Sequence, residues 1–163
     1  MKYTTNDFFL YYIEMSGTTD CQNLFKEKER ITLFESLTEE QASYRYAPEK
    51  WSIKQVISHL TDHERIMTYR ALRISRKDDT PLLGYDQDIY VANSNADNLP
   101  FEKVLDDYKC ARNASLSFMD CLAQEQWELK GQVWKFHLTV EEIMRAIIGH
   151  DMHHFNVLQK KYL

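Results

Sequence analysis

The chain has 163 residues, of which 44% are hydrophobic and 28% charged, as expected for a single globular domain that buries a core of its own. The formal charge of −5 argues against broad binding to nucleic acid or to anionic membranes. No stretch is long and apolar enough for a transmembrane helix, and the N-terminus does not resemble a signal peptide.

The three cysteines form no C-x-x-C pair, which is typical of free thiols in a reducing compartment. We therefore expect a cytoplasmic protein. Cys110 and Cys121 are eleven residues apart, so they share one face of a helix and are expected to be small core residues.

The first part of the chain is predicted to form an arm followed by a helix. Residues 1–19 mix aromatic with short polar side chains, and we expect them to pack on the domain as an arm that contains a helical turn. An N-cap region at 18–20 opens a first helix over about 20–37, in which large apolar residues recur at helical spacing. Helix formation is interrupted before Pro48, because the residue that precedes a proline is pushed out of the α region.

A second helix of about 24 residues begins at a capping box formed by Ser52 and Gln55. Its apolar stripe consists of Ile53, Val56, Ile57, Leu60, Met67, Ala71 and Ile74. Glu64 lies near the centre of the stripe, His63 on its shoulder and His59 at its edge. A carboxylate in such a position must pair with an arginine or a tyrosine hydroxyl of a neighbouring helix, or lie near a metal ion.

The remaining segments predict a loop and two more long helices. Residues 77–98 are rich in turn formers and are expected to be loop with one helical turn. A third helix runs from Pro100 to about 124, and residues 127–138 are a connector. A capping box of Thr139 and Glu142 starts the last helix. Four long amphipathic segments without an alternating strand pattern predict an all-α bundle in one domain, 1–163.

The last helix carries the most informative motif, with three histidines within five residues. His150 and His154 are four residues apart and share one face, which is the spacing at which two imidazoles bind one metal ion. Asp151 also points inward, whereas His153 points away. The alternative is that the inward histidines are core residues, each satisfied by its own hydrogen bond.

The third ligand of such a site is expected from another helix. The motif H-D-x-x-H differs by one residue from the metalloprotease H-E-x-x-H, but the nine residues after His154 contain no His, Asp, Glu or Cys. In helical bundles, metal sites are built from side chains on facing helices. His59, His63 and Glu64 of the second helix are all candidates, and spacing alone does not choose among them.

Two segments resemble the DinB-like superfamily. Residues 47–65 resemble its P-x-K-W-S…H-L-x-D-x-E segment, and Gly149 to His154 resembles its G-H-x-x-H-H element. The resemblance, which spans about 20–162, implies a four-helix bundle with a long loop between the second and third helices. It also implies that three histidines bind one divalent metal ion. Zinc or nickel is the first expectation and manganese the second. Carried over, the three histidines are His59, His150 and His154, although the apolar stripe favoured His63 or Glu64.

The resemblance also implies a function. Characterised relatives include transferases that use low-molecular-weight thiols such as bacillithiol, and they are often dimeric. We therefore expect a homodimeric enzyme that transfers such a thiol cosubstrate to an electrophilic small molecule, with no nucleic-acid or membrane partner. Glu64, Asp62 or Asp151 would orient a ligand imidazole or act as a base. The alternatives are a metal-dependent hydrolase, or a non-catalytic stress protein that binds a metal or ligand in a closed site.

Overall fold

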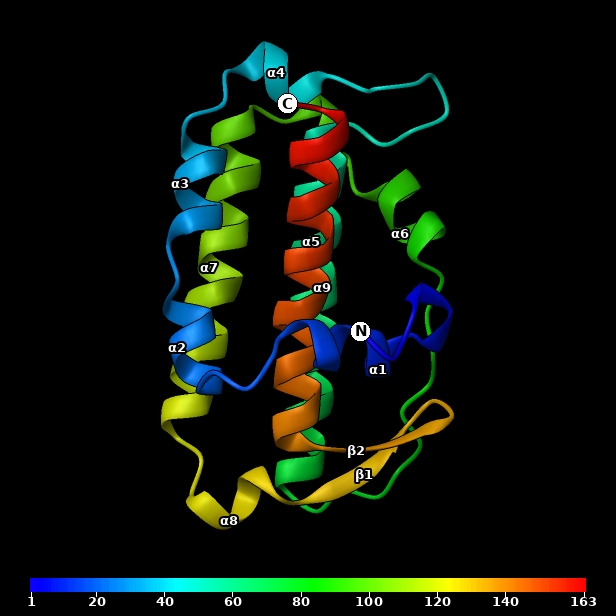
Figure 1. Cartoon of the computed structure of the whole chain (residues 1–163), viewed down its shortest axis with the longest axis vertical. Coiled ribbons are helices and arrows are strands. Elements are labelled where there is room, and N and C mark those ends of the chain that lie inside the picture. Colours follow the sequence, from blue (N-terminus) through cyan, green and yellow to red (C-terminus); the bar gives the residue numbers. More distant parts are fainter.

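The computed structural model describes every residue of the chain and forms a four-helix bundle (Figure 1). Three of the bundle helices are α5 (Ile53–Ser75), α7 (Phe101–Asp120) and α9 (Val140–Lys161), and the first is built from α2 (Cys21–Lys26) and α3 (Glu29–Glu35). Helix α5 packs against both α7 and α9, and α2 packs against the same two helices. The predicted all-α bundle is confirmed. None of the helices combines the length and apolar character needed to cross a membrane.

The first bundle helix is split, where the sequence predicted one helix over about 20–37. Glu27 lies between α2 and α3 in an extended conformation (φ −60°, ψ 129°). Arg30 donates from Nη2 to the carbonyl oxygen of Leu24 at 3.1 Å and from Nε to Asp151 of α9 at 2.8 Å. Because the last carbonyls of a helix lack partners within it, Arg30 stabilises the end of α2 at this break.

The two helices that carry the histidines begin at the predicted capping boxes. Ser52 Oγ accepts from the Gln55 backbone at 3.1 Å, and the Gln55 side chain accepts from the Ser52 backbone at 3.2 Å. Thr139 and Glu142 exchange the corresponding bonds at 3.0 and 2.7 Å. These bonds satisfy orphan N–H groups at each helix start and fix where α5 and α9 begin.

Short elements connect and cover the bundle. They are η1 (Thr5–Asp7), α1 (Phe9–Met15), α4 (Glu39–Ser43), α6 (Gln87–Asn93), η2 (Ala96–Asn98), α8 (Gln124–Trp127), β1 (Lys130–Val133) and β2 (Phe136–Thr139). The long loop between α5 and α7 therefore holds α6 and η2, more structure than the one turn predicted.

The predicted absence of strands was wrong for the connector before α9. Strands β1 and β2 form an antiparallel hairpin in which Val133 pairs with Phe136. Each strand has only four residues, too few to display a clear alternation. The turn of the hairpin also lacks the glycine that usually marks such a turn in a sequence. Trp134 adopts the positive φ, 53°, at this position instead.

The expected burial of two cysteines was wrong as well. Cys110 and Cys121 are exposed, and only Cys21 is buried. The two exposed cysteines do share a face, but α7 buries a different face, carried by Val104, Leu105, Tyr108, Ala111 and Met119. Cys121 lies beyond the last turn, at the C-cap.

The N-terminal arm crosses the middle of α9 through helix α1 (Figure 1). A Cβ atom placed on Gly149 would lie 1.8 Å from the carbonyl oxygen of Tyr12. Glycine therefore allows the two backbones to approach closely. This contact brings the Tyr12 ring edge-on to His150, with ring centroids 5.0 Å apart.

Candidate metal centre

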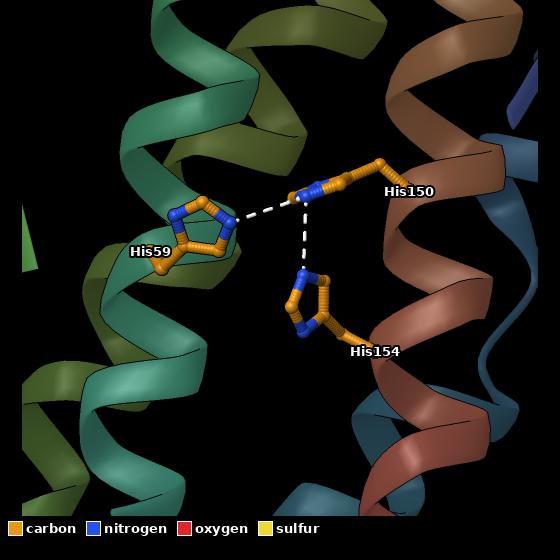
Figure 2. A group of neighbouring side chains, drawn as sticks. All are labelled: His59, His150 and His154. Carbon is orange, nitrogen blue, oxygen red and sulfur yellow. Dashed lines mark hydrogen bonds between the residues drawn. The ribbon is translucent and has the colours of Figure 1, made fainter. Parts of the chain in front are cut away.

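Three histidines from two facing helices converge in the bundle. His59 comes from α5, and His150 and His154 come from successive turns of α9 (Figure 2). The Nε2 atom of His150 lies 3.1 Å from Nε2 of His59 and 3.1 Å from Nε2 of His154. One ligand atom from each of the three lies within 4.8 Å of the others. The structure thus brings together the three residues that the family resemblance selected.

Burial keeps these imidazoles neutral. His59 and His150 are buried and His154 is half-buried. Burial lowers the pKa of His59 to about 4, and burial together with the neighbouring imidazoles lowers the pKa of His150 and His154 well below the ordinary value. A neutral imidazole has a free lone pair, which is the form that binds metal.

The donor geometry fits a divalent metal ion. Zinc–nitrogen bonds of about 2.0–2.1 Å at tetrahedral angles separate the two nitrogens by about 3.3 Å, close to the two 3.1 Å separations. Hydrogen bonding alone fits less well. A neutral Nε2 atom carries either one hydrogen or one lone pair, so Nε2 of His150 can satisfy only one of its two neighbours. Three protein ligands also leave a fourth position for water or substrate.

His150 is oriented by ring packing. Its Nδ1 atom is buried without a hydrogen-bond partner, although a ligating histidine usually donates this N–H to an acceptor. The His63 ring stacks on it, with centroids 4.0 Å apart and planes 29° apart. Tyr12 packs against it edge-on. His63, one of the candidate third ligands, therefore lies beside the cluster as a stacking partner.

Two of the three carboxylates suggested as base or orienting group lie in a separate ion-pair centre. Arg112 of α7 donates to both carboxylate oxygens of Glu64 at 3.1 Å and to Asp151 at 3.0 Å. Arg30 and the Tyr108 hydroxyl also donate to Asp151, at 2.8 and 2.9 Å. Burial alone would lower the pKa of Arg112, but Glu64, Tyr108 and Asp151 raise it well above its ordinary value. The sequence predicted that Glu64 either pairs with a group of a neighbouring helix or lies near a metal ion. In the structure it pairs with an arginine of α7.

Asp62, the third suggested carboxylate, is half-buried on α5. The pKa of Asp62 is raised above its ordinary value, because burial has the largest effect. Arg65 opposes this shift and Asp107 adds to it. No hydrogen bond ties Asp62 to a ligand imidazole. None of the three carboxylates therefore orients a histidine of the cluster in this structure.

A pocket of about 590 Å³ adjoins the histidine cluster. Its walls are Phe8, Phe9, Tyr12, His63, Met67, Arg70, Gly84, Tyr85, Asp86, Gln87, Trp134 and His150. A volume of about 300–1,000 Å³ is usual for small-molecule sites. Burial raises the pKa of Tyr12, on this wall, to about 12.

Sequence reasoning did not identify Arg70 or the residues of the N-terminal arm as walls of this pocket. Arg70 lies seven residues after His63 on the same face of α5, so its position against the apolar stripe was a usable signal. The aromatic residues of the arm were expected to pack on the domain, but no local pattern showed that they contact α9, because that contact is long-range.

Comparisons with known proteins agree with this architecture. A family model described as the DinB superfamily matches residues 27–158. Among solved structures, YfiT from Bacillus subtilis superposes with a TM-score of 0.71 at 15% sequence identity, covering 98% of this chain and 89% of that one. It is described as a probable metal-dependent hydrolase with an unusual four-helix bundle topology. No curated protein matches the chain.

Proposed function

The chain belongs to the DinB superfamily, and on that premise we propose that it is a metal-dependent enzyme acting on a small molecule. His59, His150 and His154 would hold one divalent ion, with zinc or nickel as the first choices and manganese next. The observation that carries the proposal is the convergence of three histidine side chains at a pocket of about 590 Å³, whose wall includes His150. A non-catalytic metal-binding protein would need no such pocket.

We further propose that the reaction is transfer of a low-molecular-weight thiol cosubstrate to an electrophile. When bound, a divalent cation lowers the pKa of a thiol or water beside it, and a thiol with an ordinary pKa of about 8.5 then needs no further base. Near the pocket, the carboxylates that could act as a general base are already engaged in other interactions. Glu64 and Asp151 are held by Arg112, and Asp86, the carboxylate on the pocket wall, caps α6. The thiol must be a cosubstrate, since no cysteine lines the pocket.

Hydrolysis is the second candidate, and the description of YfiT favours it. Water needs a base more than a thiol does, and His63 on the pocket wall is the side chain best placed for that role. The homodimer and the cytoplasmic location stay predictions.

One assay distinguishes these reactions. The purified protein is stripped of metal, reloaded with zinc, nickel or manganese, and incubated with bacillithiol and an alkylating electrophile, while a nitrophenyl ester tests hydrolysis. We expect metal-dependent thioether formation, detected by mass spectrometry. His150→Ala should reduce the rate of thioether formation by more than about 100-fold. Removing a residue that only orients a metal ligand typically costs about 10- to 100-fold, and removing a ligand itself should cost more. His153→Ala is the matched control, because His153 lies on the same helix but outside the three-histidine cluster, half-buried against Tyr11 and Tyr12 of the arm. Ester cleavage alone would favour the hydrolase, and neither product with any metal would contradict the enzyme.

A further inference from the structure

Arg70 is a buried cation without a carboxylate partner. It is 5% exposed, yet it forms no ion pair. Its Nη1 donates to the Met67 sulfur at 3.2 Å and its Nη2 to the Leu83 carbonyl oxygen at 2.6 Å. The other buried basic residues, Arg30, Lys54 and Arg112, each pair with a carboxylate.

An isolated buried charge is costly unless a counter-ion joins it. Burial lowers the pKa of Arg70, and the groups that oppose this shift are Tyr85 and Tyr90. Asp86 lies on the same pocket wall, but its carboxylate accepts from the backbone N–H groups of Asp88 and Ile89 at 2.9 and 3.2 Å. A guanidinium carries five N–H groups, so the two bonds that Arg70 makes leave three for a ligand.

The position of Arg70 connects it with the histidine cluster. His63, Met67 and Arg70 follow one another at helical spacing on α5 and all line the pocket. Seven residues of helix rise about 10 Å, and the bond to Met67 bends the guanidinium back toward the histidines. A small molecule anchored at Arg70 can therefore reach His63 and His150. The guanidinium also lies over the Tyr85 ring at 5.8 Å, against one of the aromatic walls.

We propose that the pocket binds a small organic carboxylate, with the carboxylate on Arg70 and an apolar body against the aromatic walls, directed at the histidine cluster. This deepens the proposed function by naming the chemistry of its substrate or cosubstrate, and it rests on that function only for the reacting end. A carboxylate is favoured over a phosphate ester because one negative charge balances the single cation, whereas a second charge would be buried without a partner.

The test measures binding to the full-length, metal-free protein, so that no ligand oxygen can bind a metal instead. The probes are 3-phenylpropionate, its neutral amide and phenyl phosphate, titrated by calorimetry. We expect the acid to bind at least about tenfold more tightly than the amide, because only the acid forms a charge-assisted bidentate pair. Arg70→Met should remove that preference. Arg73→Met is the matched control, since Arg73 lies on the same helix, pairs with Asp78 and is absent from the pocket walls.

A second measurement separates binding from folding. Arg70→Met should unfold at the same temperature as the wild type or a higher one, because it removes an unpaired buried charge. A lower unfolding temperature with unchanged binding of the acid would show that Arg70 is structural and would overturn the proposal. Equal binding of acid and amide, no saturable binding of the acid, or tighter binding of phenyl phosphate would also overturn it. The metal site is measured separately, so a failure here leaves that proposal intact.

Discussion

Two buried polar centres lie side by side and share helices α5 and α9, and they differ in how completely their groups are paired. Helix α5 contributes His63 to one and Glu64 to the other, and α9 contributes His150 and Asp151 in the same way. In the ion-pair centre, two arginines, two carboxylates and the Tyr108 hydroxyl satisfy one another. In the histidine centre, Nδ1 of His150 has no partner and a pocket opens beside the rings.

Buried polar groups therefore serve two purposes in this bundle. The ion-pair centre is closed on itself and links α3, α5, α7 and α9, so its effect is on the fold. The histidine centre leaves donor and acceptor capacity unused and directs it toward a ligand. Substitutions in the first should therefore change stability, and substitutions in the second should change binding.

The largest expected effect is from Arg112→Met. This change leaves Glu64 without its arginine, and removing one partner of a buried ion pair costs about 3–5 kcal/mol of unfolding free energy. Urea denaturation measures it. Arg65→Met is the matched control, because the Arg65–Asp107 pair is exposed and such pairs contribute at most about 1 kcal/mol. Equal losses in the two variants would contradict the assignment of the ion-pair centre to stability.

The next effect is a dependence of stability on pH in the metal-free protein. Burial lowers the pKa of His59 from 6.5 to about 4, so below pH 6.5 the unfolded chain binds a proton that the folded chain does not. Stability should be complete above about pH 7 and fall as the pH is lowered toward 4, by about 3 kcal/mol from His59 alone. The pKa values of His150 and His154 are lowered too and act in the same direction.

Urea denaturation between pH 7.5 and pH 5 tests this sign, because few carboxylates titrate in that range. His59→Leu should show a shallower loss of stability on acidification than the wild type. An identical slope in both proteins would mean that His59 is not held neutral by the fold.

A smaller effect is expected at the contact between the arm and the histidine centre. In Gly149→Ala the new methyl group would meet the Tyr12 carbonyl oxygen at 1.8 Å, so α1 must shift away from α9. We expect a loss of about 1–3 kcal/mol, typical of overpacking, and faster proteolysis within residues 1–17. Gly84→Ala is the control, because its nearest neighbour is a Trp134 carbon at 4.0 Å. Unchanged proteolysis of Gly149→Ala would show that the arm does not depend on this contact.

What could be predicted from the sequence was mostly local. The capping boxes at Ser52 and Thr139 placed the starts of α5 and α9 correctly, because their bonds span three residues. The pairing of His150 with His154 followed from helical spacing in the same way. The break between α2 and α3 was not predictable, because Arg30 stabilises it through Asp151, 121 residues away.

The third histidine shows where local reasoning ends. The apolar stripe favoured His63 or Glu64 over His59, and the family resemblance pointed to His59. The structure explains the conflict, because the centre of the stripe belongs to the ion-pair centre while His59 at its edge faces α9. The roles of Tyr12 and Arg70 depend on how distant segments pack, which periodicity does not show.

The most direct test of the account is the metal content of the wild type, His150→Ala and His153→Ala, each purified without a metal-binding tag. Elemental analysis follows incubation with zinc, nickel or manganese and removal of unbound metal. We predict about one divalent ion per chain in the wild type and in His153→Ala, and none in His150→Ala, because a three-ligand site does not survive with two. No bound metal in the wild type, or equal binding by His150→Ala, would contradict the assignment of the histidine centre as a metal site.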